Sequence, residues 1–176
     1  MSVMPKRHPS PPLFSRILLY ASVENLVYWL TEALVWIPWY FSDNLGMLAM
    51  IAITPIFMFI ATLYSLNEVP RSDWGSEIRV IVVAFVVTCA VIDLFFWIIW
   101  RGHGALEWYL PITVLGTVNF IGYLEIIVVS YVALRLAGSS GWVQGIHWRL
   151  SFSLRSIIIS GVVLFLFSLV SALLFW

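Results

Sequence analysis

The sequence predicts an all-α integral membrane protein, a bundle of about five transmembrane helices with the N-terminus in the cytoplasm and the C-terminus outside. The first observation is composition: 62% of the 176 residues are hydrophobic and 10% are charged, whereas soluble domains are about 45–50% apolar and about 25% charged. The second is that the apolar residues form long runs, and a helix needs roughly 20 of them to cross a bilayer. The third is an uneven distribution of Lys and Arg.

We expect a single transmembrane helical domain over residues 1–176. A short basic, proline-rich tail is predicted at 1–12, followed by spans at about 14–40, 45–66, 79–101, 111–137 and 155–176. The first span lacks a small-residue cleavage pattern, so it is predicted to be a retained helix and not a signal peptide. It ends where Pro38 and then Ser42, Asp43 and Asn44 supply helix-breaking and capping side chains.

Two later boundaries follow from polar or helix-breaking residues. The stretch 67–79 is the most polar in the chain and contains Pro and Gly, so a water-exposed loop is predicted there. Pro111 suits the first turn of the fourth span, because the first turn of a helix does not need its missing N–H.

The positions of Lys and Arg predict the orientation, because cytoplasmic loops carry an excess of these residues. With the N-terminus inside, Arg101 alone falls outside, and an odd number of spans places the C-terminus outside. The other eight basic residues fall inside: Lys6, Arg7, Arg16, Arg71, Arg79, Arg135, Arg149 and Arg155. Tryptophan and tyrosine side chains at the outer ends of the first and third spans agree with this orientation.

Four acidic residues lie within the predicted spans: Glu24, Glu32, Asp93 and Glu125. A charged side chain at the centre of a spanning helix costs roughly 2.5–3.5 kcal/mol on insertion scales, so these residues should face protein or a cavity. No Lys or Arg is available at mid-span to pair with them. They are therefore either protonated and hydrogen-bonded between helices, or they face water, a cation or a polar ligand.

Helical periodicity groups these acids with other polar residues. On the first span, Tyr20, Glu24, Asn25, Tyr28, Thr31 and Glu32 fall within an arc of about 140°. On the fourth, Asn119 and Tyr123 share a face, and Glu125 points about 120° away from Asn119. Glu24 and Glu125 are expected nearer the cytoplasm, and Glu32 and Asp93 nearer the outside. The predicted binding site or ion path comprises Glu24, Asn25, Tyr28, Glu32, Asp93, Asn119, Tyr123 and Glu125.

Several classes of chemistry lack a motif. The sequence contains no phosphate-binding loop, dinucleotide-binding glycine motif, zinc-hydrolase motif or serine-hydrolase motif. The single cysteine, Cys89, excludes an intrachain disulfide. We predict no catalytic residue, no metal and no cofactor, and a net charge of zero gives no reason to expect a nucleic acid partner.

Three functional interpretations remain open. The sequence favours a small transporter or a proton or cation permeation module that uses its intramembrane carboxylates. The alternatives are a non-catalytic accessory or scaffolding subunit of a larger membrane complex, and an intramembrane enzyme acting on a lipid or isoprenoid; a non-enzymatic role is favoured. The expected partners are the lipid bilayer and either further copies of the chain or a larger membrane complex. The absence of Asn-x-Ser/Thr sequons is compatible with a prokaryotic plasma membrane.

Overall fold

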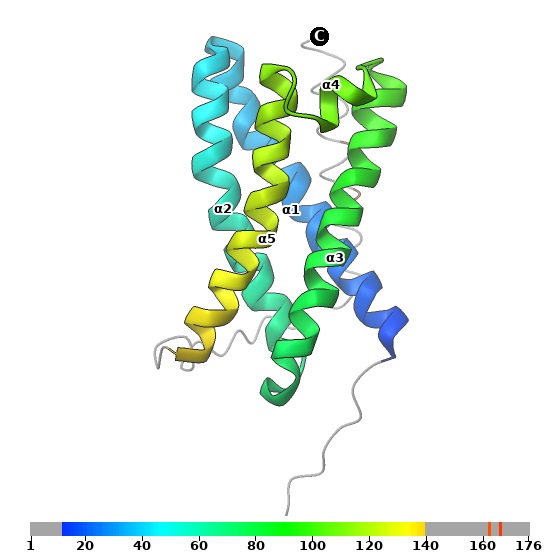
Figure 1. Cartoon of the computed structure of the whole chain (residues 1–176), viewed down its shortest axis with the longest axis vertical. Helices are drawn as coiled ribbons and strands as arrows, with labels where there is room; N and C mark the ends of the chain where they lie inside the picture. The colour runs from blue at the N-terminus through cyan, green and yellow to red at the C-terminus, as the bar shows by residue number, and fades with distance from the viewer. Residues whose placement is uncertain (1–11, 140–161, 163–165, 167–176) are drawn as a thin grey trace, which may run out of the picture.

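The computed structural model describes residues 12–139, 162 and 166, and this part of the chain contains helices and no strand. Its elements are shown in Figure 1. In chain order they are α1 (Leu13–Phe41), α2 (Asp43–Asn67), the short 3₁₀ helix η1 (Arg71–Asp73), α3 (Trp74–Ile92), the π-helical segment η2 (Asp93–Trp100), α4 (Ala105–Tyr109) and α5 (Val114–Ser139).

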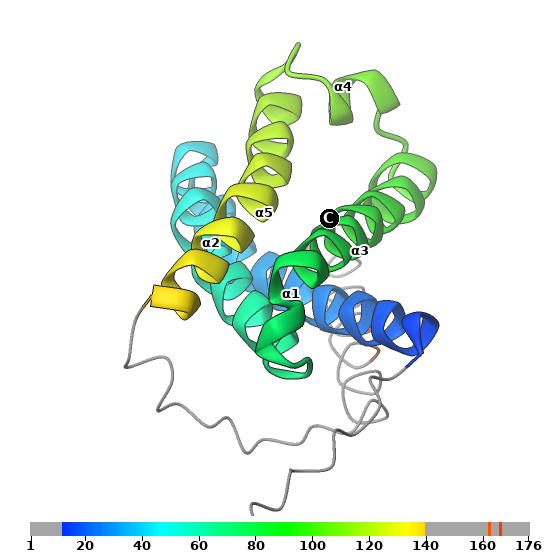
Figure 2. The ribbon, with the colours of Figure 1, turned by 60° about the horizontal axis from the view of Figure 1, so that its bottom comes forward.

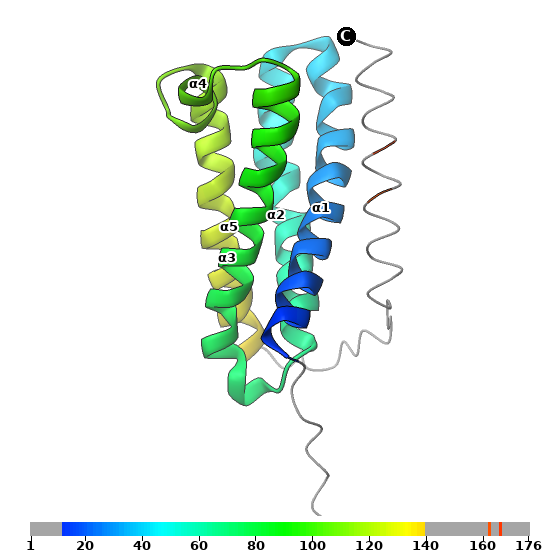
Figure 3. The ribbon, with the colours of Figure 1, turned by 90° about the vertical axis from the view of Figure 1, so that its right-hand side faces the viewer.

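The four long helices form an antiparallel bundle (Figure 1). α1 packs against α2 and α3, and α5 packs against the same two helices. In Figure 1, α5 therefore lies in front of α1, and Figure 2 shows the same four helices obliquely from below. α1 and α2 are joined by Ser42 alone, in an extended conformation. The short α4 lies across one end of the bundle, between α3 and α5 (Figure 3).

The described part of the chain contains three helices that are long and apolar enough to cross a membrane. They are α2, the continuous helix Arg71–Trp100 and α5. α1 is as long as these but is not among the three, because Arg16, Glu24 and Glu32 and its other polar residues lower its hydropathy. The predicted span at 155–176 and nearly all of the tail at 1–12 lie outside the described residues.

The ends of α1 and α2 lie within two residues of the predicted boundaries, but α3 and α5 begin elsewhere. α3 begins at Trp74, inside the stretch predicted as a loop, because Glu77 and Ile78 are buried against other helices. α5 begins at Val114 and not near Pro111. The hydroxyl of Thr113 accepts a hydrogen bond from the backbone N–H of Gly116 over 3.0 Å, which caps the helix there.

The two largest buried clusters of the described residues lie between the long helices. The first combines Tyr20 and Val23 of α1 with Met58 of α2, Phe85 of α3 and Ile126 of α5, among others. The second is aromatic and lies toward the end of the bundle that α4 covers: Tyr28, Trp29, Phe96, Trp97 and Trp108. Its rings meet edge to face or stacked, with the centroids of Trp97 and Trp108 5.2 Å apart.

Candidate functional site

A partly open cavity of about 50 Å³ lies between the helices of the bundle, and all four long helices contribute to its wall. It has room for several water molecules, since one water needs about 10–15 Å³. α1 provides Glu24, Tyr28, Thr31, Glu32 and Val35; α2 provides Met50, Thr54 and Met58; the α3–η2 helix provides Cys89 and Asp93; and α5 provides Asn119, Gly122, Tyr123 and Ile126.

Asp93 is the centre of a hydrogen-bonded network in this wall. Its side chain is 4% exposed, and its two oxygens accept bonds from the phenols of Tyr28, over 2.6 Å, and of Tyr123. The Tyr28 oxygen in turn accepts a bond from the Trp97 indole N–H over 2.7 Å. The network therefore connects α1, η2 and α5 through one carboxyl group. Asp93 is also the residue at which the π-helical segment begins, and such segments are rare and often occur at functional sites.

Glu24 is the second acid of the cavity and is 1% exposed. Its Oε2 atom is buried and makes no hydrogen bond within the described part of the chain. The same holds for the hydroxyls of Thr31 and Thr54, which are buried and line the same cavity. A buried polar group without a partner costs about 1–3 kcal/mol. Three such oxygens around one cavity are a set of acceptors suited to water, a proton carrier or a small cation.

Glu32 brings a third carboxyl group to the wall. No Lys, Arg or His occurs among the described residues that line the cavity. In a bundle interior of low dielectric constant, charges of one sign repel strongly, so a bound proton or cation lowers the energy of the three acids. The described wall therefore carries acidic side chains and no basic one.

Six of the eight predicted site residues line this cavity: Glu24, Tyr28, Glu32, Asp93, Asn119 and Tyr123. Asn25 accepts a hydrogen bond from the Trp29 indole over 3.0 Å and lines a separate, mainly apolar pocket between α1 and the α3–η2 helix. Glu125 does not line the cavity; it is half-buried, and its Oε2 atom has no hydrogen-bond partner in the described part of the chain. Of the four acids within the predicted spans, Glu24, Glu32 and Asp93 line the cavity and Glu125 does not.

Asn119 and Tyr109 connect the cavity wall to the end of the bundle covered by α4. The Asn119 amide donates to the Trp108 carbonyl over 3.4 Å, and the Tyr109 hydroxyl donates to the Ala90 carbonyl over 2.8 Å. Burial, with the charge of Asp93, raises the pKa of Tyr109 to about 12, so this phenol keeps its proton and remains a donor at neutral pH. These bonds fix α4 over the cavity.

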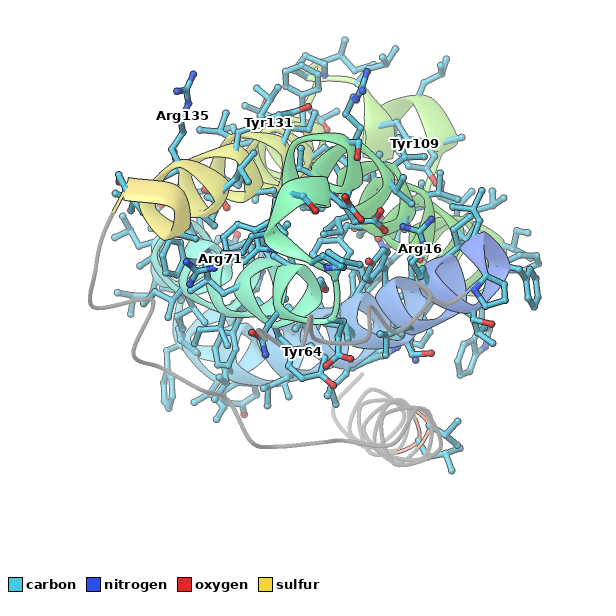
Figure 4. All side chains as sticks on the ribbon, turned by 90° about the horizontal axis from the view of Figure 1, so that it is seen from below. Arg16, Tyr64, Arg71, Tyr109, Tyr131 and Arg135 are labelled. Carbon is cyan, nitrogen blue, oxygen red and sulfur yellow. The ribbon has the colours of Figure 1, made fainter. Side chains whose placement is uncertain are left out.

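A second polar cluster, which the sequence did not reveal, lies at the opposite end of the bundle. Glu77 of α3 is 3% exposed, pairs with Arg16 of α1 and accepts a hydrogen bond from the Tyr20 hydroxyl over 2.7 Å. Figure 4 shows Arg16 directed from α1 into the bundle, whereas Arg135 points away from it. The signal that marks this part of α3 is the apolar period of Trp74, Ile78, Ile81 and Phe85, which predicts a helix through the assigned loop.

Within the described residues, no group of three or more His, Cys, Asp or Glu side chains is placed to hold a metal ion. Comparison with known proteins found no matching family model, no matching curated protein and no matching solved structure.

Proposed function

We propose that the chain is a small membrane transporter or permeation module that moves protons or monovalent cations through the cavity lined by Glu24, Glu32 and Asp93. The observation that carries this proposal is that three carboxyl side chains, and no basic residue among the described ones, line one cavity between the helices. Acids inside membrane bundles are costly and occur chiefly where a substrate or ion passes.

The hydrogen-bonding groups of the cavity support a proton or a small cation as the substrate. Tyr28 and Tyr123 hold Asp93, while Glu24, Thr31 and Thr54 each present a buried oxygen without a partner in the described part of the chain. A proton can pass between carboxyl groups through phenols and water, and a small cation can exchange hydration oxygens for carboxyl and hydroxyl oxygens.

The proposal includes five spans, with the N-terminus in the cytoplasm and the C-terminus outside, in an oligomer in a prokaryotic plasma membrane. Arg16 near the start of α1, Arg71 in η1 and Arg135 near the end of α5 belong to one end of the bundle (Figure 1), whereas Arg101 follows η2 at the end that α4 covers. Under the rule that basic residues face the cytoplasm, this distribution supports the orientation. α1, with its polar face turned to the cavity, is the first span.

The size of the cavity argues against the enzymatic alternative. Pockets that bind drug-sized molecules are about 300–1,000 Å³, whereas the acids here surround about 50 Å³. The larger pocket, of about 240 Å³, has no acid in its wall. A lipid or isoprenoid would therefore not meet two carboxyl groups at once.

The test is flux through purified protein in proteoliposomes. Proton entry is followed with a trapped pH-sensitive dye under a potassium diffusion potential, and Na⁺ and K⁺ uptake are followed in parallel with isotopes. Wild type is compared with Glu24→Gln, Glu32→Gln and Asp93→Asn, and Glu107→Gln on the exposed face of α4 is the matched control. Each variant must show the helical content of the wild type and the same elution volume in gel filtration.

We expect flux in wild type and in Glu107→Gln and its loss in Glu24→Gln and Asp93→Asn. Equal flux in the wild type and the four variants, all of them folded, would overturn the proposal that the carboxyl groups carry the substrate. No proton, Na⁺ or K⁺ flux in any of them would reject the proposal in favour of the accessory-subunit alternative.

A further inference from the structure

The side chains of Arg16, Tyr20 and Glu77 do not line the cavity, yet they include an ion pair in which Glu77 is buried and Arg16 is partly exposed. Arg16 and Glu77 lie on different helices, so the pair joins α1 to α3 at the end of the bundle where both helices begin. Tyr20 strengthens the link, because its hydroxyl occupies the second oxygen of the Glu77 carboxylate. The position assigns this cluster to the cytoplasmic end of the proposed path.

Three side chains at successive turns of α1 connect the cluster to the cavity. Arg16, Tyr20 and Glu24 are four residues apart, so they follow one another along a single side of the helix at about 6 Å per step. Arg16 and Tyr20 contact Glu77, and Glu24 lines the cavity. The cytoplasm and the cavity are thus separated by about 12 Å along α1.

An apolar layer fills this interval on the side of α3. Ile81, Ala84 and Phe85 are buried and pack in the same cluster as Tyr20 and Val23 of α1. In the proposed path, water or a cation reaches Glu24 from this side when α1 and α3 separate enough to part the layer. The ion pair opposes that separation.

The ion pair is suited to break and re-form. The Nε atom of Arg16 is buried and makes no hydrogen bond within the described residues, so the guanidinium is incompletely satisfied. An ion pair contributes most when all its polar atoms are bonded, so this one holds the two helices less firmly than a complete pair would. Arg16 is also partly exposed, which gives water access to it.

We infer that Arg16 and Glu77, with Tyr20, form the cytoplasmic gate of the cavity and close it by holding α1 against α3. This inference rests on the proposed function, because a gate serves the cavity as a point of passage. Arg16 and Glu77 are gate residues and need not bind the substrate.

Cys89 provides the test, because it lines the cavity and is the single cysteine of the chain. The full-length protein in lipid nanodiscs is treated with methanethiosulfonate ethylammonium, and the rate of modification is followed by intact mass. The variants are Arg16→Gln, Glu77→Gln and the charge exchange Arg16→Glu with Glu77→Arg. Glu107→Gln is the matched control at the other end of the bundle, and Cys89→Ala shows that the reaction is specific.

We expect slow modification in wild type and in Glu107→Gln, and a rate at least about tenfold higher in each single gate variant, equivalent to about 1.4 kcal/mol in the closing equilibrium. The charge exchange should restore the slow rate, because it re-forms the pair with its charges reversed; a rate that stays high in the folded exchange variant would show that the pairing of the two charges does not close the cavity. If a single variant does not fold, Tyr20→Phe removes one bond of the cluster and should give a smaller increase.

Equal modification rates in wild type and in all folded gate variants would overturn the gate, even if the flux measurements support permeation. Conversely, faster modification with restoration in the charge exchange would show that the ion pair controls access to Cys89, even if no liposome shows flux and the proposed function is rejected. The labelling and flux measurements therefore test the gate and the proposed function separately. Labelling of Cys89 needs only access to the cavity, whereas flux needs passage through it.

Discussion

Tyr28 of α1 donates a hydrogen bond of 2.6 Å to Asp93, at the residue where α3 passes into the π-helical segment. Both side chains are buried, and the same phenol oxygen accepts the indole N–H of Trp97. One hydroxyl group therefore satisfies a carboxyl group and an indole at once. It also positions Asp93 in the cavity wall, so this contact contributes to the stability of the bundle and to the geometry of the proposed site.

Tyr28→Phe should lower both stability and flux. Removing the hydroxyl leaves an oxygen of Asp93 and the N–H of Trp97 without this partner, at a cost of about 1–3 kcal/mol. The free energy of unfolding is measured by titration with SDS in mixed micelles. The matched control is Tyr131→Phe, since Tyr131 is exposed on α5. An unchanged unfolding free energy in Tyr28→Phe would show that the bond contributes nothing net.

Thr54→Val separates a structural from a functional role of the cavity oxygens. The Thr54 hydroxyl is buried without a hydrogen-bond partner in the described residues, so replacing it with a methyl group of similar size should leave stability unchanged or raise it. If the hydroxyl contacts the passing water or cation, flux should fall by severalfold in the same variant. Proteoliposome flux and SDS titration are compared on one preparation; wild-type flux with raised stability would exclude Thr54 from the path.

The polar face of α1 could be predicted from the sequence because it depends only on helical periodicity. Glu24, Tyr28 and Glu32 recur on one side of a single helix, and they line the cavity together. The position of Thr54 in the cavity wall could not be predicted, because it depends on which helices are neighbours in the bundle. A lone threonine within an apolar run is typical of many spanning helices, and only the packing of α2 against α1 and α5 brings it to the cavity.

Glu125 and Glu77 also show that a single sequence does not determine which acids are buried in the bundle. Glu125 was predicted as a site residue because an acid within a span is costly, but periodicity already turned it away from Asn119, and it does not line the cavity. Glu77 was placed in a loop because Pro70 and Gly75 lie nearby, yet the pairing with Arg16 allows it to be buried in a helix. Glu77 is buried beside its partner Arg16 on another helix, and a single sequence does not specify that pairing.

Thr62 and Ser130 join α2 to α5 through one hydrogen bond of 3.0 Å between two buried hydroxyls. Thr62→Val and Ser130→Ala should each destabilise the protein, and the double variant should cost less than the sum of the two. Interhelical hydrogen bonds in membrane proteins contribute about 0.6 kcal/mol on average and up to about 1.7 kcal/mol, so we expect a coupling energy in this range. The double-mutant cycle is measured by SDS titration. Strict additivity would mean that the two hydroxyls do not interact.

Gly116 is required where α5 begins, because the preceding backbone crosses close to it. A Cβ atom at this position would lie 2.0 Å from the carbonyl oxygen of Leu110 and 2.4 Å from that of Glu107. Backbone atoms cannot move aside as a flexible side chain can, so Gly116→Ala should displace the α4 segment and destabilise the protein by about 1–3 kcal/mol.

The matched control is Gly138→Ala on the same helix, where an added Cβ would meet nothing within 4 Å. Alanine favours the helical conformation over glycine by up to about 1 kcal/mol, so the control should be neutral or slightly stabilising. Thermal unfolding of both variants in one detergent, followed by circular dichroism, makes the comparison. Because α4 also bonds to Asn119 through the Trp108 carbonyl, Gly116→Ala should reduce flux more than its loss of stability alone accounts for, whereas an unchanged melting temperature would show that the α4 backbone is free to shift.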